Sequence, residues 1–330
     1  MPEAPAATET PSRPEVPASG RRARKVARAE ARKTSAWLPR WFWPSFTFPG
    51  LLWLLVMFIL PFYAVVSVAF GSIDRFRNPL PVWQPWYWTT KYTGEVFQKF
   101  FGENAYLQPT FIRTLIYVGI ASSILLVAGY AVAYYVARHA GKRKTLILVL
   151  LISPFWISYL MRMLAWVNLL ESDGYVNRTL QLLHVTDQPI AWLQGKPITV
   201  ILGLVYGYMP YMILPLFGFL DRIQPSLLEA GRDLGGSPTS TFVRVTLPLS
   251  KPAILAGLVI VSLPMFGDYY TQNLLSASPK TNMYGNLIDE AVGASGQGPQ
   301  GAVLVLILMV MLLVPMMYYL RSTLRAQEGR

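Results

Sequence analysis

Charged residues are scarce in this sequence, and cysteine is absent from it. Asp, Glu, Lys and Arg together make up 14% of the 330 residues, whereas soluble domains carry about a quarter. Hydrophobic residues make up 53%. This balance excludes an ordinary soluble domain and predicts a membrane protein. Because no Cys is present, neither a disulfide framework nor a thiolate metal site is possible.

Signatures of catalysis are also missing. No G-x4-G-K-[ST] element occurs, since the Gly141-Lys142 pair lacks its partner glycine, so the chain should not hydrolyse ATP itself. His139 and His184 are the only histidines, and no H-E-x-x-H motif or carboxylate pair marks a membrane enzyme. We therefore expect a chain that is not an enzyme, with no metal site and no cofactor.

The apolar residues are gathered in long blocks. A helix of roughly 20 residues crosses a hydrocarbon core about 30 Å thick, and six blocks approach or exceed that length. The sequence therefore predicts an all-α, polytopic membrane protein with six transmembrane helices, over residues 49–70, 114–137, 145–167, 197–220, 252–276 and 301–320.

The basic residues indicate the orientation. Residues 1–40 have too few large apolar groups to form a core and are predicted to be disordered, and their run RRARKVARAEARK holds seven basic residues. With six spans, the positive-inside rule puts both termini and the loops 138–144 and 221–251 in the cytoplasm. The run should touch anionic headgroups rather than nucleic acid, because nothing beside it supplies base-reading chemistry. We expect a cytoplasmic tail over 1–40 and a membrane domain over 41–330.

The loop over 221–251 is longer than a turn requires and is patterned. Pro225 can open a helix over 226–234, and two consecutive glycines end it. A second short helix is expected over 239–246, stopped before Pro248. Such a hairpin is either a docking surface or an amphipathic helix that lies on the membrane.

The same loop carries a family motif. Glu229-Ala230, Gly235 and Val245-x-Leu247-Pro248 have the spacing E-A-A-x3-G-x9-I-x-L-P, which resembles the EAA signature of permease subunits in binding-protein-dependent ABC importers. Two positions depart, with Gly in place of the second Ala and Val in place of Ile. The resemblance implies a type I ABC importer permease fold whose loop couples to an ATPase. The residues implied in coupling are Glu229, Ala230, Gly231, Asp233, Gly235, Val245, Leu247 and Pro248.

The family also implies partners and a location. A permease of this kind works in a bacterial plasma (inner) membrane with two ABC ATPase subunits, a second homologous permease and an extracytoplasmic substrate-binding protein. Outer loops, including 83–88 with its tryptophans and 282–290, would receive the binding protein. The implied mechanism is alternating access driven by ATP.

A second region indicates which branch of this family the sequence resembles. The stretch 262–292, SLPMFGDYYTQNLLSASPKTNMYGNLIDEAV, resembles the fifth-span region of spermidine/putrescine permeases, with an L-G-(E/D)-(F/Y) element and an M-x-G-N segment. A polyamine substrate is thereby implied, although permeases for iron, sulfate and molybdate share the EAA loop.

Two charges inside the predicted spans are candidates for the substrate path. A charged group in the membrane normally faces protein or water. Arg162 either does so or extends to the outer interface. Asp268, expected roughly 24 Å along the fifth span, either holds a cationic substrate beside aromatic rings or pairs with Arg162. The candidate path residues are Tyr159, Arg162, Trp166, Asp268, Tyr269 and Tyr270.

Two other function classes remain open. An ATP-independent secondary carrier or channel would be driven by an ion gradient and would need no ATPase. A membrane enzyme is disfavoured by the missing catalytic residues. The Asn-x-Thr pattern at Asn177 is interpreted as chance.

Overall fold

The computed structural model describes residues 42–102 and 105–328, so the predicted tail over 1–40 lies outside the described residues. The chain divides into two compact units, one ending at Phe62 and one beginning at Tyr63. Helix α2 (Phe42–Ala69) contributes to both. Apart from helices, the described residues form one short antiparallel pair, β1 (Ser72–Ile73) with β2 (Pro79–Leu80).

Among the described residues, five helices are long and apolar enough to cross a membrane, and a bent helix pair supplies a sixth crossing if it counts as one span. The five lie in α2, α4 (Leu107–His139), α8 (Pro197–Leu220), α11 (Leu247–Phe266) and α14 (Gly298–Glu328). The predicted all-α, polytopic class is confirmed. The bounds of α8 agree with the predicted span, whereas α4 and α14 begin before the predicted residues and end after them.

The predicted third span, 145–167, is not one continuous helix. The chain instead forms α5 (Lys144–Ile152), η3 (Ser153–Trp156) and α6 (Tyr159–Leu170), with a bend of 85° at the break. Ile157 and Ser158 are both extended, with ψ of 142° and 141°, and they interrupt the helical path between η3 and α6. The break therefore sets the first turn of α6 at a new angle.

The predicted fifth span also ends too late. Helix α11 stops at Phe266, and the chain turns through Gly267 and Asp268 before the short α12 (Tyr270–Leu275). After it come η5 (Pro279–Thr281) and α13 (Tyr284–Gly293). Asp268 therefore lies at a helix break and not within a helix.

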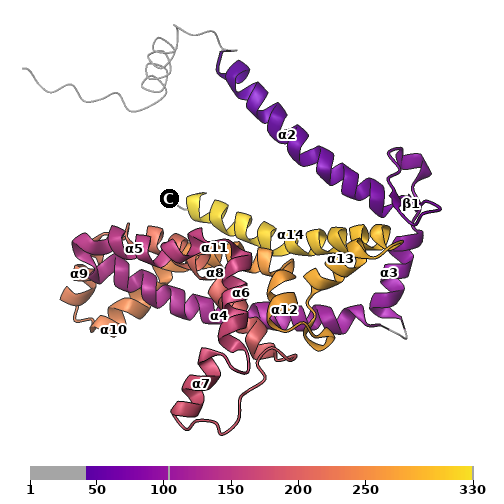
Figure 1. The fold of residues 1–330 in the computed structure, drawn as a ribbon. Helices are drawn as coiled ribbons and strands as arrows, with labels where there is room; N and C mark the ends of the chain where they lie inside the picture. The colour runs from indigo at the N-terminus through magenta and orange to yellow at the C-terminus, as the bar shows by residue number, and fades with distance from the viewer. Residues whose placement is uncertain (1–41, 103–104, 329–330) are drawn as a thin grey trace, which may run out of the picture. The chain divides into compact units, whose positions relative to one another are not determined.

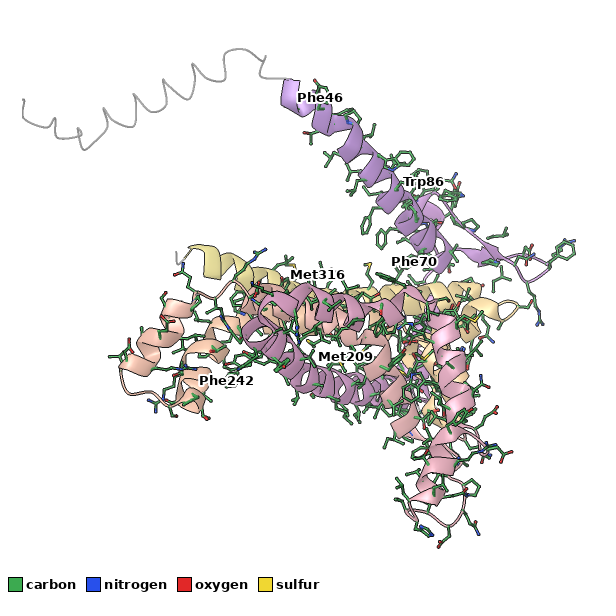
Figure 2. The ribbon with its side chains drawn as sticks, turned by 60° about the vertical axis from the view of Figure 1, so that its left-hand side comes forward. Phe46, Phe70, Trp86, Met209, Phe242 and Met316 are labelled. Atoms are coloured by element: carbon green, nitrogen blue, oxygen red, sulfur yellow. The ribbon has the colours of Figure 1, made fainter. Side chains whose placement is uncertain are left out.

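The core of the second unit is built where α8 packs against α4 and α11 (Figure 1). Met212 of α8, which is fully buried, lies between glycines of the two other helices. A Cβ at Gly129 would lie 2.8 Å from Met212 Cγ, and a Cβ at Gly257 would lie 2.8 Å from its Sδ. Small residues at these positions let the three helices approach closely. Met209, labelled in Figure 2, packs against the same core.

A second buried cluster joins α14 to α13, α4 and α3 (Lys91–Phe101). Tyr284 is fully buried there, and its hydroxyl donates to Leu304 O at 3.0 Å. The cluster therefore fixes the position of the first residues of α13.

The loops contain η1 (Pro85–Tyr87), η2 (Gly141–Arg143) and α7 (Tyr175–Leu182). The Asn177 side chain is fully buried and bonded to Glu171 O, Ile190 O, Ile190 N and Trp192 Nε1, each at 3.0 Å. Asn177 therefore ties the loop after α6 together, which gives this residue a structural role.

Candidate functional site

The first candidate site is the docking segment, defined here as residues 225–246. It begins with α9 (Pro225–Asp233), with Pro225 in its first turn. Gly235 has a φ of +81°, its N–H donates to Arg232 O at 2.8 Å, and the N–H of Gly236 donates to Gly231 O at 3.1 Å. These two bonds form a Schellman cap, and the predicted glycine end of this helix is confirmed.

The second arm of the segment differs from the prediction. α10 (Pro238–Thr241) continues through η4 (Phe242–Thr246), a π-helical turn, directly into α11. The expected stop before Pro248 is wrong because this proline lies in the first turn of α11, where a missing N–H costs little. A continuous helical connection therefore links the docking segment to a membrane span.

The motif residues divide into two groups. Gly231 faces the second arm, since a Cβ there would lie 3.3 Å from Thr241 Cγ2 and 3.5 Å from Val245 Cγ2. Leu247, half-buried, packs against the core of the helices. The exposed group consists of Glu229, Ala230, Asp233, Gly235 and Pro248.

A second link runs from the docking segment to α4. Phe242, labelled in Figure 2, meets the rings of Tyr130 and Tyr134 edge-on, with centroids 5.8 and 5.3 Å away. The Tyr130 hydroxyl in turn lies 2.9 Å from Ser250 Oγ of α11. Movement of the docking segment would therefore be transmitted to both α4 and α11.

The second candidate site is a cavity of about 620 Å³ between α6, α8 and the break that follows α11. This volume lies within the usual range for small-molecule sites, about 300–1,000 Å³. Five of the six predicted path residues line it. The lining consists of Tyr159, Arg162, Gly207, Tyr208, Tyr211, Ile260, Pro264, Gly267, Asp268, Tyr269 and Tyr270.

The carboxylate of Asp268 is the most densely bonded group in the cavity wall. Its Oδ2 accepts hydrogen bonds from Tyr159 Oη at 3.1 Å, Tyr208 Oη at 3.3 Å and Thr271 Oγ1 at 2.6 Å. Its Oδ1 accepts from Thr271 N at 3.0 Å, and the residue is only 7% exposed. Both carboxylate oxygens therefore have hydrogen-bond donors within the wall.

The cation in the same cavity is held differently. The guanidinium carbon of Arg162 lies 4.4 Å from the ring centroid of Phe155, 5.4 Å from that of Tyr159 and 5.8 Å from that of Tyr206. Within the described part of the chain, Arg162 and Asp268 form no ion pair. Trp166, the sixth predicted path residue, does not line the cavity and packs edge-on against Tyr206, with the ring planes 70° apart.

Sequence reasoning missed the contribution of α8. Tyr208 and Tyr211 were not predicted, although the glycine spacing in this helix was a signal. A Cβ at Gly207 would lie 2.8 Å from Tyr159 Cε2, and one at Gly203 would lie 2.6 Å from Thr271 Cγ2. Because both positions are glycine, α6 and α12 pack closely against this face of α8. This packing places the hydroxyls of Tyr159 and Thr271 next to Asp268.

The M-x-G-N element holds the bend that carries Asp268. A Cβ at Gly285 would lie 2.6 Å from Gly267 O and 2.7 Å from Gly267 C, so only glycine lets α13 approach this backbone. Next to it, Asn286 Nδ2 donates to Tyr269 O at 3.1 Å, and Asn286 Oδ1 accepts from Met283 N at 2.8 Å.

This contact leads to a prediction for Gly285→Ala. The added methyl would push the 267–268 backbone away and lower the free energy of unfolding by about 1–3 kcal/mol. Thermal denaturation of the purified protein would measure the loss. Gly293→Ala is the matched control, because a Cβ at this other α13 glycine would meet nothing within 4 Å. Equal stability of the two variants would contradict the close contact between Gly285 and the backbone of residue 267.

The acidic and imidazole side chains do not gather at one point in the described ranges, 42–102 and 105–328. There, no group of three or more His, Cys, Asp or Glu side chains is arranged to hold a metal ion. The cavity offers one carboxylate, hydroxyl groups and aromatic faces. Such a lining suits an organic cation with apolar carbon atoms.

Comparisons with known proteins agree with this architecture. Residues 126–324 match the family described as binding-protein-dependent transport system inner membrane component. The spermidine/putrescine transport system permease protein PotB of Escherichia coli (strain K12) is 36% identical over 204 residues, covering 62% of this chain and 74% of that protein. PotB of Haemophilus influenzae is 32% identical over 273 residues, covering 82% and 90%.

A solved structure has the same fold. The crystal structure of a bacterial alginate ABC transporter in complex with an alginate pentasaccharide-bound periplasmic protein contains a chain that aligns with a TM-score of 0.68 at 17% identity. The alignment covers 87% of this chain and 95% of that chain. This chain is a multi-pass inner-membrane transport component and belongs to the family of binding-protein-dependent transport system inner membrane components.

Proposed function

We propose that this chain is the permease subunit of an ATP-driven importer of polyamines such as spermidine and putrescine, and that it forms half of their path through the membrane. The observation that carries the proposal is the cavity in which the Asp268 carboxylate lies among tyrosines. The names of the relatives point to the same class of substrate.

The cavity chemistry matches an alkyl ammonium ion. The ammonium would contact the Asp268 oxygens by charge and hydrogen bonding. Tyr269 and Tyr270, stacked with centroids 4.2 Å apart, offer aromatic faces for cation-π contact. The methylene groups would lie on Ile260 and Pro264, which line the same cavity.

Transport by this chain would require partners. Two ABC ATPase subunits would bind α9 and its equivalent in a second homologous permease, and an extracytoplasmic protein would deliver the polyamine. Both termini would then be cytoplasmic, and the loops over 83–88 and 282–290 would face the binding protein. Trp86, 76% exposed and labelled in Figure 2, offers apolar surface for that contact.

Alternating access would follow from the connections of the docking segment. Closure of the ATPase pair would move α9, and the continuous helical path from α10 to α11 would carry this movement to the break at Gly267. Opening toward the outside would admit the polyamine, and reopening of the ATPases would turn the cavity inward.

Uptake measurements test this function. In cells that lack the chain, we expect ATP-dependent uptake of labelled spermidine or putrescine to return when the wild-type chain is supplied. Uptake that persists after ATP depletion and follows an ion gradient would favour a secondary carrier. If neither polyamine depends on the chain, the substrate assignment is wrong.

A further inference from the structure

The lining of the cavity lacks the net negative charge that a polyamine requires. Its charged residues are Asp268 and Arg162, and their charges sum to zero. Putrescine carries two ammonium groups and spermidine carries three, whereas one carboxylate can contact only one ammonium group closely. The remaining positive charge therefore calls for a second carboxylate next to the cavity.

Asp289 of α13 is placed to supply it. One turn earlier in this helix, Asn286 Nδ2 donates to Tyr269 O at 3.1 Å and to Asn273 Oδ1 at 2.8 Å, which joins α13 to α12 (Figure 1). Residues three positions apart share a face of a helix. Asp289 therefore lies on the face of α13 that meets Tyr269, and Tyr269 lines the cavity.

The Tyr269 hydroxyl is within the electrostatic reach of both carboxylates. Its pKa is raised to about 12, chiefly by a hydrogen bond to Tyr270, and the negative charges of Asp289 and Asp268 add to the increase. The rings of Tyr269 and Tyr270 are stacked, with centroids 4.2 Å apart. An aromatic surface thus adjoins both acidic groups.

The Asp289 carboxylate is free to bind a ligand. The residue is exposed, and within the described part of the chain no salt bridge engages it. The next residue, Glu290, differs, because Asn282 Nδ2 donates to its Oε1 at 2.8 Å and it lines a separate, smaller cavity. Asp289 is therefore the better candidate for an ammonium ligand.

Asp289 also lies toward the side from which a substrate would arrive. Gly285, at the start of α13, packs on the backbone beside Asp268. Beyond the other end of the helix, the N–H of Gly296 donates at 2.9 Å to the carbonyl of Arg77, in the loop between β1 and β2. In the proposed orientation this loop faces outward, so Asp289 is on the outer side of Asp268.

We propose that Asp289 binds a second ammonium group of the polyamine whose first ammonium group lies at Asp268, and that it thereby makes the site prefer diamines to monoamines. The inference rests on the proposed function. The methylene chain would lie against the stacked rings of Tyr269 and Tyr270. With both carboxylates, the site has one negative charge in excess of Arg162.

The test is equilibrium binding to the purified complex of the permeases and ATPase subunits. Labelled spermidine is displaced by putrescine or by butylamine, which has the same carbon chain and one ammonium group. Wild type should bind putrescine more tightly than butylamine. In Asp289→Asn and Asp289→Ala, the affinity for putrescine should fall by about fivefold, the upper range for an exposed ion pair, and the affinity for butylamine should not change.

Matched variants separate charge from other effects. Asp289→Glu keeps the charge and should keep the preference for putrescine. Glu290→Gln removes a negative charge from the adjacent position and should bind both amines as wild type does. Asp268→Asn should weaken the binding of both amines, because it removes the site of the first ammonium group. Copurification of the ATPase subunits verifies the assembly of each variant.

Each outcome decides the inference. A loss confined to putrescine in the charge-removing variants of Asp289 supports it. Unchanged putrescine binding in an assembled variant overturns it, as does an equal loss of butylamine binding. A wild-type complex that binds both amines equally overturns it even if the variants fail to assemble.

The inference and the proposed function fail in different ways. A wild-type complex that imports polyamine with its binding protein, but binds no polyamine without it, overturns the inference and leaves the proposed function intact. A wild-type complex that imports no polyamine overturns the proposed function and this inference with it.

Discussion

Asp268→Asn should lower polyamine uptake by roughly two orders of magnitude or more, because removing one partner of a buried charge pair costs about 3–5 kcal/mol. The substitution keeps the shape of the side chain but removes the negative charge that would bind an ammonium ion. Tyr159, Tyr208 and Thr271 can rotate their hydroxyls to bond the amide, so the cavity wall should persist. Labelled-polyamine uptake by the complete transporter measures the effect.

Asp173→Asn is the control, since it removes the same charge from an exposed loop position. The Asp268 variant should still copurify with its ATPase subunits and retain basal ATP hydrolysis, because the substitution is remote from α9 in the chain. Normal polyamine uptake by an assembled Asp268→Asn transporter would contradict a substrate-binding role for this residue.

The parts of the fold that were predictable depend on local signals. The docking segment has Pro225 at a helix start and a glycine pair at its end, and both effects act within a few residues of the chain. The span in α8 was predictable for the same reason, since a polar residue stands on each side of one unbroken apolar run. The family motif in the segment added the expected spacing of these elements.

The helix breaks were harder to predict. Pro154 disfavours a continuous helix, yet prolines at 210 and 215 lie inside the continuous α8. Whether a proline breaks a helix depends on which neighbours satisfy the freed carbonyl groups, and those neighbours come from distant parts of the chain. The break after Phe266 likewise depends on Gly285 of α13 packing against Gly267.

The relation between Arg162 and Asp268 also required the structure. Either substrate binding by Asp268 or a direct ion pair was compatible with the sequence. The ion pair is not formed in the described part of the chain, because the bend before α6 directs Arg162 among three aromatic rings. The hydroxyls that donate to Asp268 come from α6, α8 and α12. The residue spacing within any one of these segments does not predict that the three side chains lie together.

Glu229→Arg should reduce ATP-driven uptake by about 100-fold or more while leaving the chain in the membrane. Glu229 is exposed on α9, and within the described residues no ion pair engages it, so the free chain has no structural need for the carboxylate. In a partner's cleft, a reversed charge meets groups arranged for the original sign, and such mismatches cost several kcal/mol.

The control for this prediction is Glu171→Arg, which makes the same charge reversal at an exposed position following α6 and should transport normally. The two readouts are polyamine uptake and the amount of ATPase subunit that copurifies. If Glu229→Arg retains the ATPase but loses uptake, the carboxylate acts in transmission of movement. If both are lost, it acts in docking, and if both are normal, the coupling role of Glu229 is wrong. Because the arm that follows α9 runs through α10 and η4 into α11 without a break and contacts α4 through Phe242, failure at this one exposed residue would be enough to leave the cavity at Asp268 uncoupled from ATP.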